Sequence, residues 1–426
     1  MISSAFRRRA VPLGVAVALV GGTVALLPSA AEAHNGGGNH GAQSVIFING
    51  DGMSAAHREA LRLLAAGFDG DTAMDSLPVS GLEETDPRDP NAAITDSAAA
   101  ATAWATGTKT FNGAISVDVN KKPLTTLGVE AKKAGKATGL VTTAQVTDAS
   151  PAAFFSNVAD RGQQSEIARQ YIEVSKPDVI LGGGEDRWYP TGTPGAYPDA
   201  PAEDPTEHSQ SDKGNLVQEA QQRGYQYVST AQQLNSVNPT RPVLGLFANE
   251  EMFQQKPEGQ GDLYNPVVPL STMTSKALQV LDKDKDGFFL FVEEEGVDEF
   301  AHQNNATRML QAMQELDKAV QVARDYVARH PNTLLVVTGD HDCGGPTVEE
   351  ATDTADESGD GTHISGEDGP FAIKGTNKQF VIDWTTTGHT GVPTVVTAQG
   401  PNSDQLEGYY PNTHIHDVLR TTLLGH

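Results

Sequence analysis

Residues 287–302 of the chain read GFFLFVEEEGVDEFAH, and they join an apolar run directly to acidic and histidine side chains. The run Phe288–Val292 is uninterrupted and aromatic, which is typical of a strand buried on both faces. Beyond it, Asp298 and His302 are spaced i and i+4, so on a helix they share one face and can hold one ion. This stretch predicts a buried strand that carries metal ligands at its end.

Six further short apolar runs alternate with helix-like segments: SVIFIN from Ser44, ATGLVTT from Ala137, DVILGGG from Asp178, VLGLFA from Val243, TLLVVTGD from Thr333 and PTVVTAQG from Pro393. Parallel sheets are covered by helices on both faces, so their strands read as continuous apolar runs. The sequence contains no internal repeat and no composition shift that marks a domain boundary. It therefore predicts an α/β fold, a single large domain with a central, mostly parallel sheet flanked by helices on both faces.

Three other segments have a local prediction. Ala306–His330 carries an apolar stripe at helical spacing and is expected to form a long helix. Pro190–Asn215, rich in proline and aspartate, and Glu349–Asp368, which is strongly acidic, are expected to be loops.

The first 33 residues have the pattern of a signal peptide. Arg7–Arg9 precede the apolar run Val11–Leu27, and Ala31–Ala33 forms a small-x-small cleavage site. A membrane anchor is the alternative, but the run is short and broken by two glycines. The arginines leave the Sec and twin-arginine routes both open. We expect residues 34–43 to form a flexible arm, residues 44–426 to form the single folded domain, and the protein to be secreted.

The charge of the chain restricts its partners. The formal net charge is −25, and residues 1–33 contribute +2, which leaves −27 on the remainder. So acidic a chain is not expected to bind nucleic acid, or a membrane once the signal peptide is removed. An anionic substrate needs local positive charge. The one cysteine, Cys343, excludes an intrachain disulfide.

Carboxylates and histidines recur just beyond the predicted strands. Asp51 follows the first run, Asp148 the second, and Asp340 and His341 follow TLLVVTG, while His389 lies in a glycine-flanked loop. Ligands of open α/β sheets gather beyond the carboxyl ends of the strands. Each residue alone is more often structural, but carboxylate and imidazole together favour zinc or a similar ion.

A calcium-loop pattern also occurs here. Residues 282–293, with Asp282, Asp284, Asp286 and Glu293, match the EF-hand consensus pattern, although Leu290 stands at the ninth position of the loop. The intervening residues FFLFV belong in a buried strand instead. We therefore interpret the aspartates as a solvated turn and Glu293 as a ligand at the end of the strand.

Thr95–Gly107, TDSAAAATAWATG, places Ser97 between an aspartate and four alanines. Ser and Asp favour helix N-caps and alanine is the best helix former, which gives one explanation. The other is that a ligand approaches the start of this helix, since a helix N-terminus favours phosphate.

These motifs together resemble the alkaline phosphatases over nearly the whole chain after residue 33. The resemblance rests on INGDGM, TDSAAAATAWATGTKTFNGAI, TTAQVTDASPAAF, DVILGGG, FVEEEGVDEFAH, VTGDHDCGG and GHTG, in that order. It implies two zinc ions and one magnesium ion per chain. By the resemblance, the first zinc site is Asp298, His302 and His389, the second is Asp51, Asp340 and His341, and the magnesium site is Asp51, Ser150 and Glu293, with Asp148 holding magnesium-bound water.

The resemblance further implies a serine nucleophile, Ser97, and a phosphate-gripping arginine, Arg161, that Asp96 orients. The implied activity is hydrolysis of small-molecule phosphate monoesters through a phosphoserine, by a monomer or homodimer. A phosphodiesterase on the same scaffold and a non-catalytic metal- or phosphate-binding protein are the alternatives. A binder needs no nucleophile, so Ser97 and Arg161 together disfavour the last. The sulfatases share the fold, but Ser97 lacks their x-Pro-x-Arg sequence.

Two residues depart from the family pattern. Glu299 stands where some relatives carry lysine or histidine near the phosphate, which implies weaker phosphate binding. Ser150 replaces a common threonine, and its hydroxyl can still bind magnesium.

Overall fold

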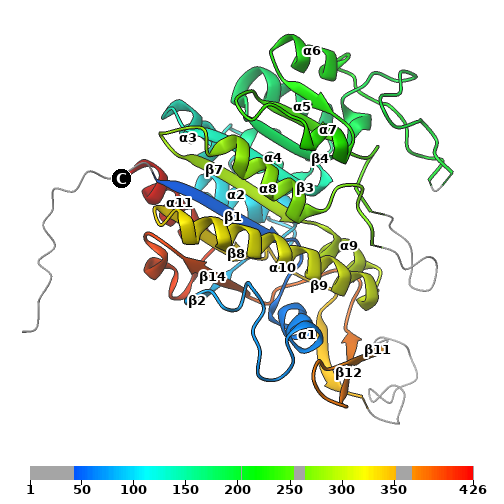
Figure 1. Cartoon of the computed structure of the whole chain (residues 1–426), viewed down its shortest axis with the longest axis vertical. Helices are drawn as coiled ribbons and strands as arrows, with labels where there is room; N and C mark the ends of the chain where they lie inside the picture. Colours follow the sequence, from blue (N-terminus) through cyan, green and yellow to red (C-terminus); the bar gives the residue numbers. More distant parts are fainter. Residues whose placement is uncertain (1–42, 203, 254–263, 352–366, 426) are drawn as a thin grey trace, which may run out of the picture. The chain divides into compact units, whose positions relative to one another are not determined.

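The protein is organised around one ten-stranded sheet. The computed structural model describes residues 43–202, 204–253, 264–351 and 367–425, which lie in one compact unit (Figure 1). The predicted signal peptide and, apart from Gln43, the predicted arm lie outside these ranges. In spatial order the strands are β15 (Gly408–Pro411), β2 (Val79–Glu84), β14 (Thr394–Gln399), β8 (Thr333–Thr338), β1 (Ser44–Gly50), β7 (Phe288–Glu294), β3 (Ala137–Gln145), β4 (Val179–Gly183), β6 (Val243–Leu246) and β5 (Gln226–Val228).

Most of this sheet is parallel, as predicted. The seven neighbouring strands from β8 to β5 all run in one direction. All seven apolar runs contain a strand, but β14 pairs antiparallel with both β8 and β2. An apolar run reports burial rather than strand direction, so the sequence pattern did not distinguish β14 from its parallel neighbours.

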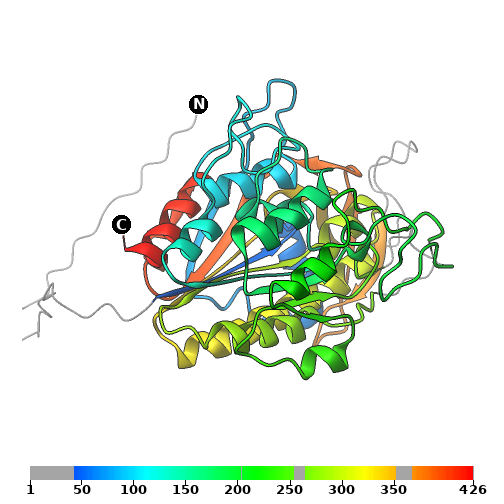
Figure 2. The ribbon, with the colours of Figure 1, turned by 90° about the horizontal axis from the view of Figure 1, so that it is seen from above.

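Helices cover both faces of the sheet, and alternate residues of β1 show why. Ile46 and Ile48 enter one apolar core with α1 (Ala55–Ala65), α8 (Leu270–Leu281), α9 (Gly296–His302) and α10 (Ala306–Arg329). Val45 and Phe47 enter a second core with the helices of the other face, which include α2 (Ser97–Thr106) and α11 (Thr413–Leu424). Figure 2 shows α10 below the sheet and α2 and α11 above it. Phe47 stacks edge-on against Trp104, with ring centroids 4.9 Å apart. Burying a side chain of this size stabilises the fold by about 1.5–3 kcal/mol.

The helices keep their predicted positions where the sequence was periodic. The long helix predicted over 306–330 is α10, Ala306–Arg329. No helix within the described ranges is both long and apolar enough to span a bilayer. The remaining helices are α1 (Ala55–Ala65), α2 (Ser97–Thr106), α3 (Leu127–Lys133), α4 (Ala149–Phe155), α5 (Gln164–Gln170), η1 (Tyr171–Ser175), η2 (Glu185–Arg187), α6 (Leu216–Gln222), α7 (Ala231–Asn235), α8 (Leu270–Leu281), α9 (Gly296–His302), η3 (Ser403–Leu406) and α11 (Thr413–Leu424).

Two small sheets lie beyond β8. A three-stranded antiparallel sheet has the order β10-β12-β11, and a two-residue pairing joins β9 to β13. That pairing sets His389 opposite Cys343. The strands are β10 (Pro346–Glu350), β12 (Gln379–Trp384), β11 (Glu367–Ala372), β9 (Asp342–Cys343) and β13 (His389–Thr390).

One of the two predicted loops is partly wrong. The described residues of 190–215 form no helix or strand beyond an isolated bridge from Pro190 to Ser211. In 349–368, however, β10 continues to Glu350 and β11 begins at Glu367. Pairing with β12 outweighs the acidic composition at both ends, and residues 352–366 lie outside the described ranges.

The EF-hand pattern is folded as a turn and a strand. Residues 288–294 form the fully buried strand β7, which confirms the strand prediction. Before it, Asp282 accepts a hydrogen bond from the Tyr326 hydroxyl at 2.6 Å, and Asp284 accepts one from the backbone N–H of Asp286 at 2.8 Å. Asp282 is therefore bound by a tyrosine of α10 and Asp284 by the turn itself, whereas Glu293 lies inside the protein.

This difference predicts the result of removing each carboxylate. Asp284→Ala and Asp286→Ala should leave metal content and activity nearly unchanged, because these side chains lie in a turn at the surface. Glu293→Ala should lose magnesium. Its activity should fall by more than about 10- to 100-fold, which is the usual cost of removing a residue that only supports a metal ligand. Metal analysis and turnover of the purified variants check this. Loss of a stoichiometric calcium ion from the Asp284 and Asp286 variants would restore the EF-hand interpretation.

Candidate active site

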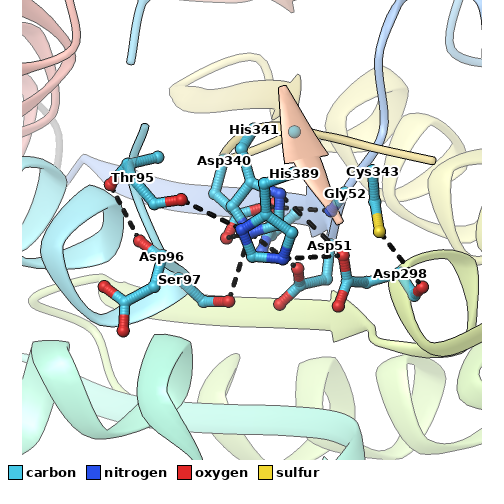
Figure 3. Close-up of polar contacts among 12 residues, drawn as sticks. Asp51, Gly52, Thr95, Asp96, Ser97, Asp298, Asp340, His341, Cys343 and His389 are labelled. Atoms are coloured by element: carbon cyan, nitrogen blue, oxygen red, sulfur yellow. Dashed lines mark hydrogen bonds and ion pairs between the residues drawn. The ribbon is translucent and has the colours of Figure 1, made fainter. Parts of the chain in front are cut away.

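The predicted ligands come together at the carboxyl ends of four neighbouring strands. Asp51 directly follows β1, Asp340 follows β8, Glu293 lies near the end of β7, and Asp148 follows β3. Because β8, β1, β7 and β3 are adjacent in the sheet, their ends lie side by side. Figure 3 shows Asp51 and Asp340 there, together with Asp298, His341 and His389.

The first group contains Asp298, His302 and His389, together with Cys343. Their ligand atoms all lie within 4.8 Å of one another. Asp298 and His302 share one face of α9, as the i, i+4 spacing predicted, with 3.2 Å between His302 Nε2 and Asp298 Oδ2. The Nε2 atoms of His302 and His389 are 3.1 Å apart. Two imidazole nitrogens and a carboxylate at these separations suit one zinc-like ion.

Backbone carbonyls orient both imidazoles. Nδ1 of His302 lies 2.6 Å from the carbonyl oxygen of Thr387, and Nδ1 of His389 lies 2.9 Å from that of Thr95. A carbonyl oxygen only accepts, so each Nδ1 carries a proton, and when the ring is neutral its Nε2 has a lone pair for a metal. A hydrogen bond from the far ring nitrogen to a carbonyl oxygen in this way fixes the orientation of a histidine that binds a metal.

The second group is Asp51, Asp340 and His341, all buried. His341 Nε2 lies 3.2 Å from Asp340 Oδ2 and 3.5 Å from Asp51 Oδ1, and neither of these two oxygens has a hydrogen-bond partner among the described residues. Buried oxygens without a donor are costly unless a cation binds them. This chain's own residues therefore fit a second ion.

A glycine lets the first strand approach this site closely. Gly52 donates its backbone N–H to Asp340 Oδ1 at 3.0 Å. It has φ +69°, and a Cβ there would lie 2.7 Å from Asp298 Oδ1. Glycine is the residue that accepts this conformation and leaves room for the carboxylate.

The residues of the expected magnesium site are also close to one another. Glu293 accepts hydrogen bonds from Thr142 at 2.7 Å and Asn49 at 3.3 Å, and Ser150 lies beside it in the first turn of α4. Asp148 forms its direct contact with Arg161, whose Nη2 lies 3.0 Å from Asp148 Oδ2.

Charge crowding shifts the ionisation of these carboxyls. Burial, with the charges of Asp340, Asp298 and Glu293, raises the pKa of Asp51 well above its ordinary value. Burial likewise raises the pKa of Glu293 to about 8 and of Asp340 to about 7. Burial opposes ionisation of Asp298 too, but hydrogen bonds from His302 and His389 lower its pKa well below its ordinary value. Such a group of carboxylates suits divalent cations.

Ser97 stands at the start of α2, with its Oγ 3.3 Å from His341 Nε2 (Figure 3). The helix is buried from Ser97 to Ala105 and packs against α4 and α11. Its alanines are needed because there is no room for larger side chains. The first turn therefore brings one hydroxyl and the positive end of a helix dipole to the second metal group.

Asp96 connects this turn to Arg161. Its Oδ1 accepts the backbone N–H of Ala99 at 3.0 Å as the N-cap of α2. Its Oδ2 accepts the backbone N–H of Gly113 at 2.8 Å and lies 3.4 Å from Arg161 Nη1. Both explanations of the TDSAAAA stretch, the cap and the approach of a ligand, are thus compatible with one geometry.

Sequence reasoning missed several members of the site. Thr142, Asn49 and Gly52 support the ligands but carry no spacing pattern of their own. Cys343 lies two residues after His341, and its Sγ is 3.5 Å from the backbone oxygen of Asp298. The only feature of the sequence that could have drawn attention to Cys343 is that it is the one cysteine of the chain and follows His341 closely.

Comparison with known proteins agrees with this geometry. The family model described as alkaline phosphatase matches residues 42–359. The chain belongs to the alkaline phosphatase family. It is 35% identical to the streptomycin-6-phosphate phosphatase of Streptomyces griseus, over 93% of this chain and 94% of that protein. It is 32% identical to the alkaline phosphatase of Escherichia coli (strain K12), over 90% and 86%.

A solved structure shares the fold. The cold-active alkaline phosphatase of Shewanella sp. superposes with a TM-score of 0.73 at 30% identity, over 89% of this chain and 99% of that one. The resemblance drawn from the motifs is confirmed, and so is the fold class. Alkaline phosphatases are metal-dependent hydrolases, and the protein is accordingly a phosphatase.

Removing the metals should destabilise the protein, and more strongly as the pH rises. Without cations, the folded pKa of Glu293, about 8, lies above its ordinary 4.5, so the folded state binds more protons than the unfolded state between these values. The stability of the chelated protein therefore falls as the pH rises from about 5 to 8. An ion present at 1,000 times its Kd contributes about 4 kcal/mol.

Thermal unfolding with and without chelator checks this prediction. The loss of Tm on chelation should be larger at pH 8 than at pH 5.5, and added zinc and magnesium should restore it. An equal loss at both pH values would mean that these carboxylates do not bind the ions.

Proposed function

We propose that the protein is an exported phosphomonoesterase that hydrolyses small-molecule phosphate monoesters through a phosphoserine at Ser97. The observation that supports this best is the Ser97 hydroxyl, placed at a helix N-terminus within 3.3 Å of a metal-binding histidine. The proposal assigns residues 1–33 to a signal peptide, 34–43 to an arm and 44–426 to the catalytic domain, in a monomer or homodimer. A monoester of the kind in the Streptomyces griseus relative's name represents the substrate class.

The metal assignment follows the three groups of ligands. We assign one zinc ion to Asp298, His302 and His389, a second to Asp51, Asp340 and His341, and magnesium to Asp51, Ser150 and Glu293, with Asp148 on a magnesium-bound water. When bound, these ions supply Lewis-acid activation of a hydroxyl or water and neutralise the charge on the phosphate. They also supply positive charge in a chain whose formal net charge is −25.

The reaction consists of two displacements at phosphorus. The Ser97 oxygen forms a bond to phosphorus and gives up its proton, while the ester bond breaks and the alkoxide leaves and is protonated. Water then attacks the phosphoserine, restores the Ser97 hydroxyl and releases inorganic phosphate. Each displacement inverts the configuration, so the net outcome is retention. Arg161 and the helix N-terminus hold the non-bridging oxygens throughout.

Arg161 favours a monoester over a diester. Its guanidinium, held between Asp148 and Asp96, is one-third exposed and presents a planar donor fork to the site. A monoester leaves two non-bridging oxygens for such a fork, and a diester has a second ester group in the way.

The covalent step is tested by Ser97→Ala. The variant should form no acid-stable phosphoserine and should lose orders of magnitude in turnover, while its metal content stays intact. A residual rate is expected, because bound metals still activate water. Mass spectrometry of acid-quenched protein identifies the modified peptide. A phosphopeptide from another part of the chain would contradict the assignment.

The substrate class is tested by Arg161→Ala. Charge-assisted hydrogen bonds contribute roughly 1.5–3 kcal/mol each, and in a solvent-open pocket the pair should contribute on the order of 2–4 kcal/mol. At about 1.4 kcal/mol per tenfold, monoester kcat/KM should fall roughly 30- to 1,000-fold. Diester turnover should fall much less.

Parallel assays on a monoester and a diester measure this difference. Equal losses on both would assign Arg161 to the fold or the metals rather than to the phosphate. A wild-type enzyme that prefers diesters would favour the phosphodiesterase alternative.

A further inference from the structure

The three consecutive glutamates at the end of β7 have three different environments. Glu293 lies with the magnesium ligands. Glu294 is satisfied by the protein, since it accepts hydrogen bonds from the Tyr264 hydroxyl, from Thr143 at 2.8 Å and from the backbone N–H of Gly296 at 3.1 Å. Glu295 is only 5% exposed, and its Oε2 has no hydrogen-bond partner among the described residues. A buried carboxylate oxygen in this state lacks a cation or a donor.

Glu295 lies close to other acidic residues. Glu299 follows it by one turn of α9 and donates its backbone N–H to the Glu295 carbonyl oxygen at 3.3 Å. Thr143 joins Glu295 to the segment of Glu251, because its Oγ accepts the backbone N–H of Glu295 at 3.0 Å and its carbonyl oxygen accepts that of Met252 at 2.9 Å. Burial, and with it the charges of Asp148, Glu251 and Glu299, accordingly raises the pKa of Glu295. Glu251 is held in place by Gln145 Nε2, which donates to it at 2.9 Å. Within the described part of the chain, no lysine, arginine or histidine forms an ion pair with Glu251, Glu295 or Glu299.

The spacing of this acidic group argues against a single metal ion. The described residues contain two groups of three or more metal-binding side chains with ligand atoms within 4.8 Å of one another, and neither includes Glu251, Glu295 or Glu299. A monatomic ion needs its ligands closer together than this group holds them. A polyatomic cation with several N–H donors can instead reach carboxylates that stand apart.

The acidic group adjoins the phosphate site. Asp148 binds Arg161 Nη2 at 3.0 Å, and Glu299 directly follows the metal-binding Asp298 on α9. Both Glu251 and Glu299 are partly exposed, so a bound molecule can reach them. We propose that Glu295, Glu299 and Glu251 bind a positively charged substituent, a primary ammonium or a guanidinium, on the alcohol part of the phosphate monoester. This proposal rests on the proposed phosphomonoesterase function and specifies its substrate class.

Three matched substrates test it: 2-aminoethyl phosphate, 2-guanidinoethyl phosphate and the uncharged n-propyl phosphate. The readout is the ratio of kcat/KM for each cationic ester to that for the neutral one, which cancels any general loss of activity. A charge-assisted hydrogen bond is worth roughly tenfold or more in binding. Glu295→Gln and Glu299→Gln should therefore each lower the ratio about tenfold. The cationic ester whose ratio falls more shows whether the site prefers ammonium or guanidinium.

Glu250→Gln is the matched control. It removes the same charge from the residue beside Glu251, but Glu250 already pairs with Arg187 at 3.2 Å. Its ratio should stay within about twofold of the wild-type ratio, since Arg187 already offsets the charge of Glu250. Tm values confirm that each variant folds, and the partly exposed Glu299 provides the test if Glu295→Gln is unstable.

Two results would overturn the inference. One is an unchanged ratio in both the Glu295 and Glu299 variants. If the wild-type protein still hydrolyses n-propyl phosphate in that case, the proposed phosphatase function is unaffected. The other is loss of a bound metal ion from these variants, which would make the acidic group a metal site. If wild type hydrolysed none of the three esters, the proposed function itself would fail.

Discussion

Mutual repulsion among buried carboxylates is the constraint on which the active site depends. Asp51, Glu293 and Asp340 are buried at the carboxyl ends of adjacent strands, and Asp298 is buried on α9, the helix that follows β7. Removing a carboxylate from water costs several kcal/mol, and bringing like charges together adds to that cost. Bound divalent cations reverse the sign of the interaction. The fold thus supplies a rigid frame, and the cations make the charged centre of that frame stable.

Much of this frame could be predicted because its signals are local. A strand buried on both faces is a continuous apolar run, and the run Phe288–Val292 is β7. A residue that directly follows a predicted strand lies at the carboxyl edge of the sheet. The strands before Asp51 and Asp340 therefore predicted where these two residues lie. His389 was a candidate because of its glycine-flanked loop, but only the family resemblance assigned it to the zinc site of Asp298 and His302, since its position depends on the pairing of β13 with β9. The antiparallel direction of β14 and the strand ends at Glu350 and Glu367 likewise depend on distant partners, which no local pattern encodes.

The environment of Asp96 shows why a structural and a chemical explanation of one stretch need not compete. One carboxylate oxygen caps α2 and the other meets Gly113 and the guanidinium of Arg161. The hydrogen bonds that begin the helix therefore also fix the arginine relative to the Ser97 hydroxyl. A cap alone would be satisfied by serine or asparagine, whereas a cap that also neutralises an arginine requires a carboxylate.

The balance of charge around the site also affects which substrates it can bind. A chain of formal charge −25 repels a dianionic phosphate at long range, and the metals and Arg161 offset this only inside the site. A cationic substituent on the substrate removes much of that repulsion and gives Glu295 the partner that the protein does not provide among its described residues. Glu299 would attract such a cationic group, whereas a lysine at the same position would repel it. On this proposal, the acidic residues around the site favour phosphate esters that carry a positive charge over esters that carry none.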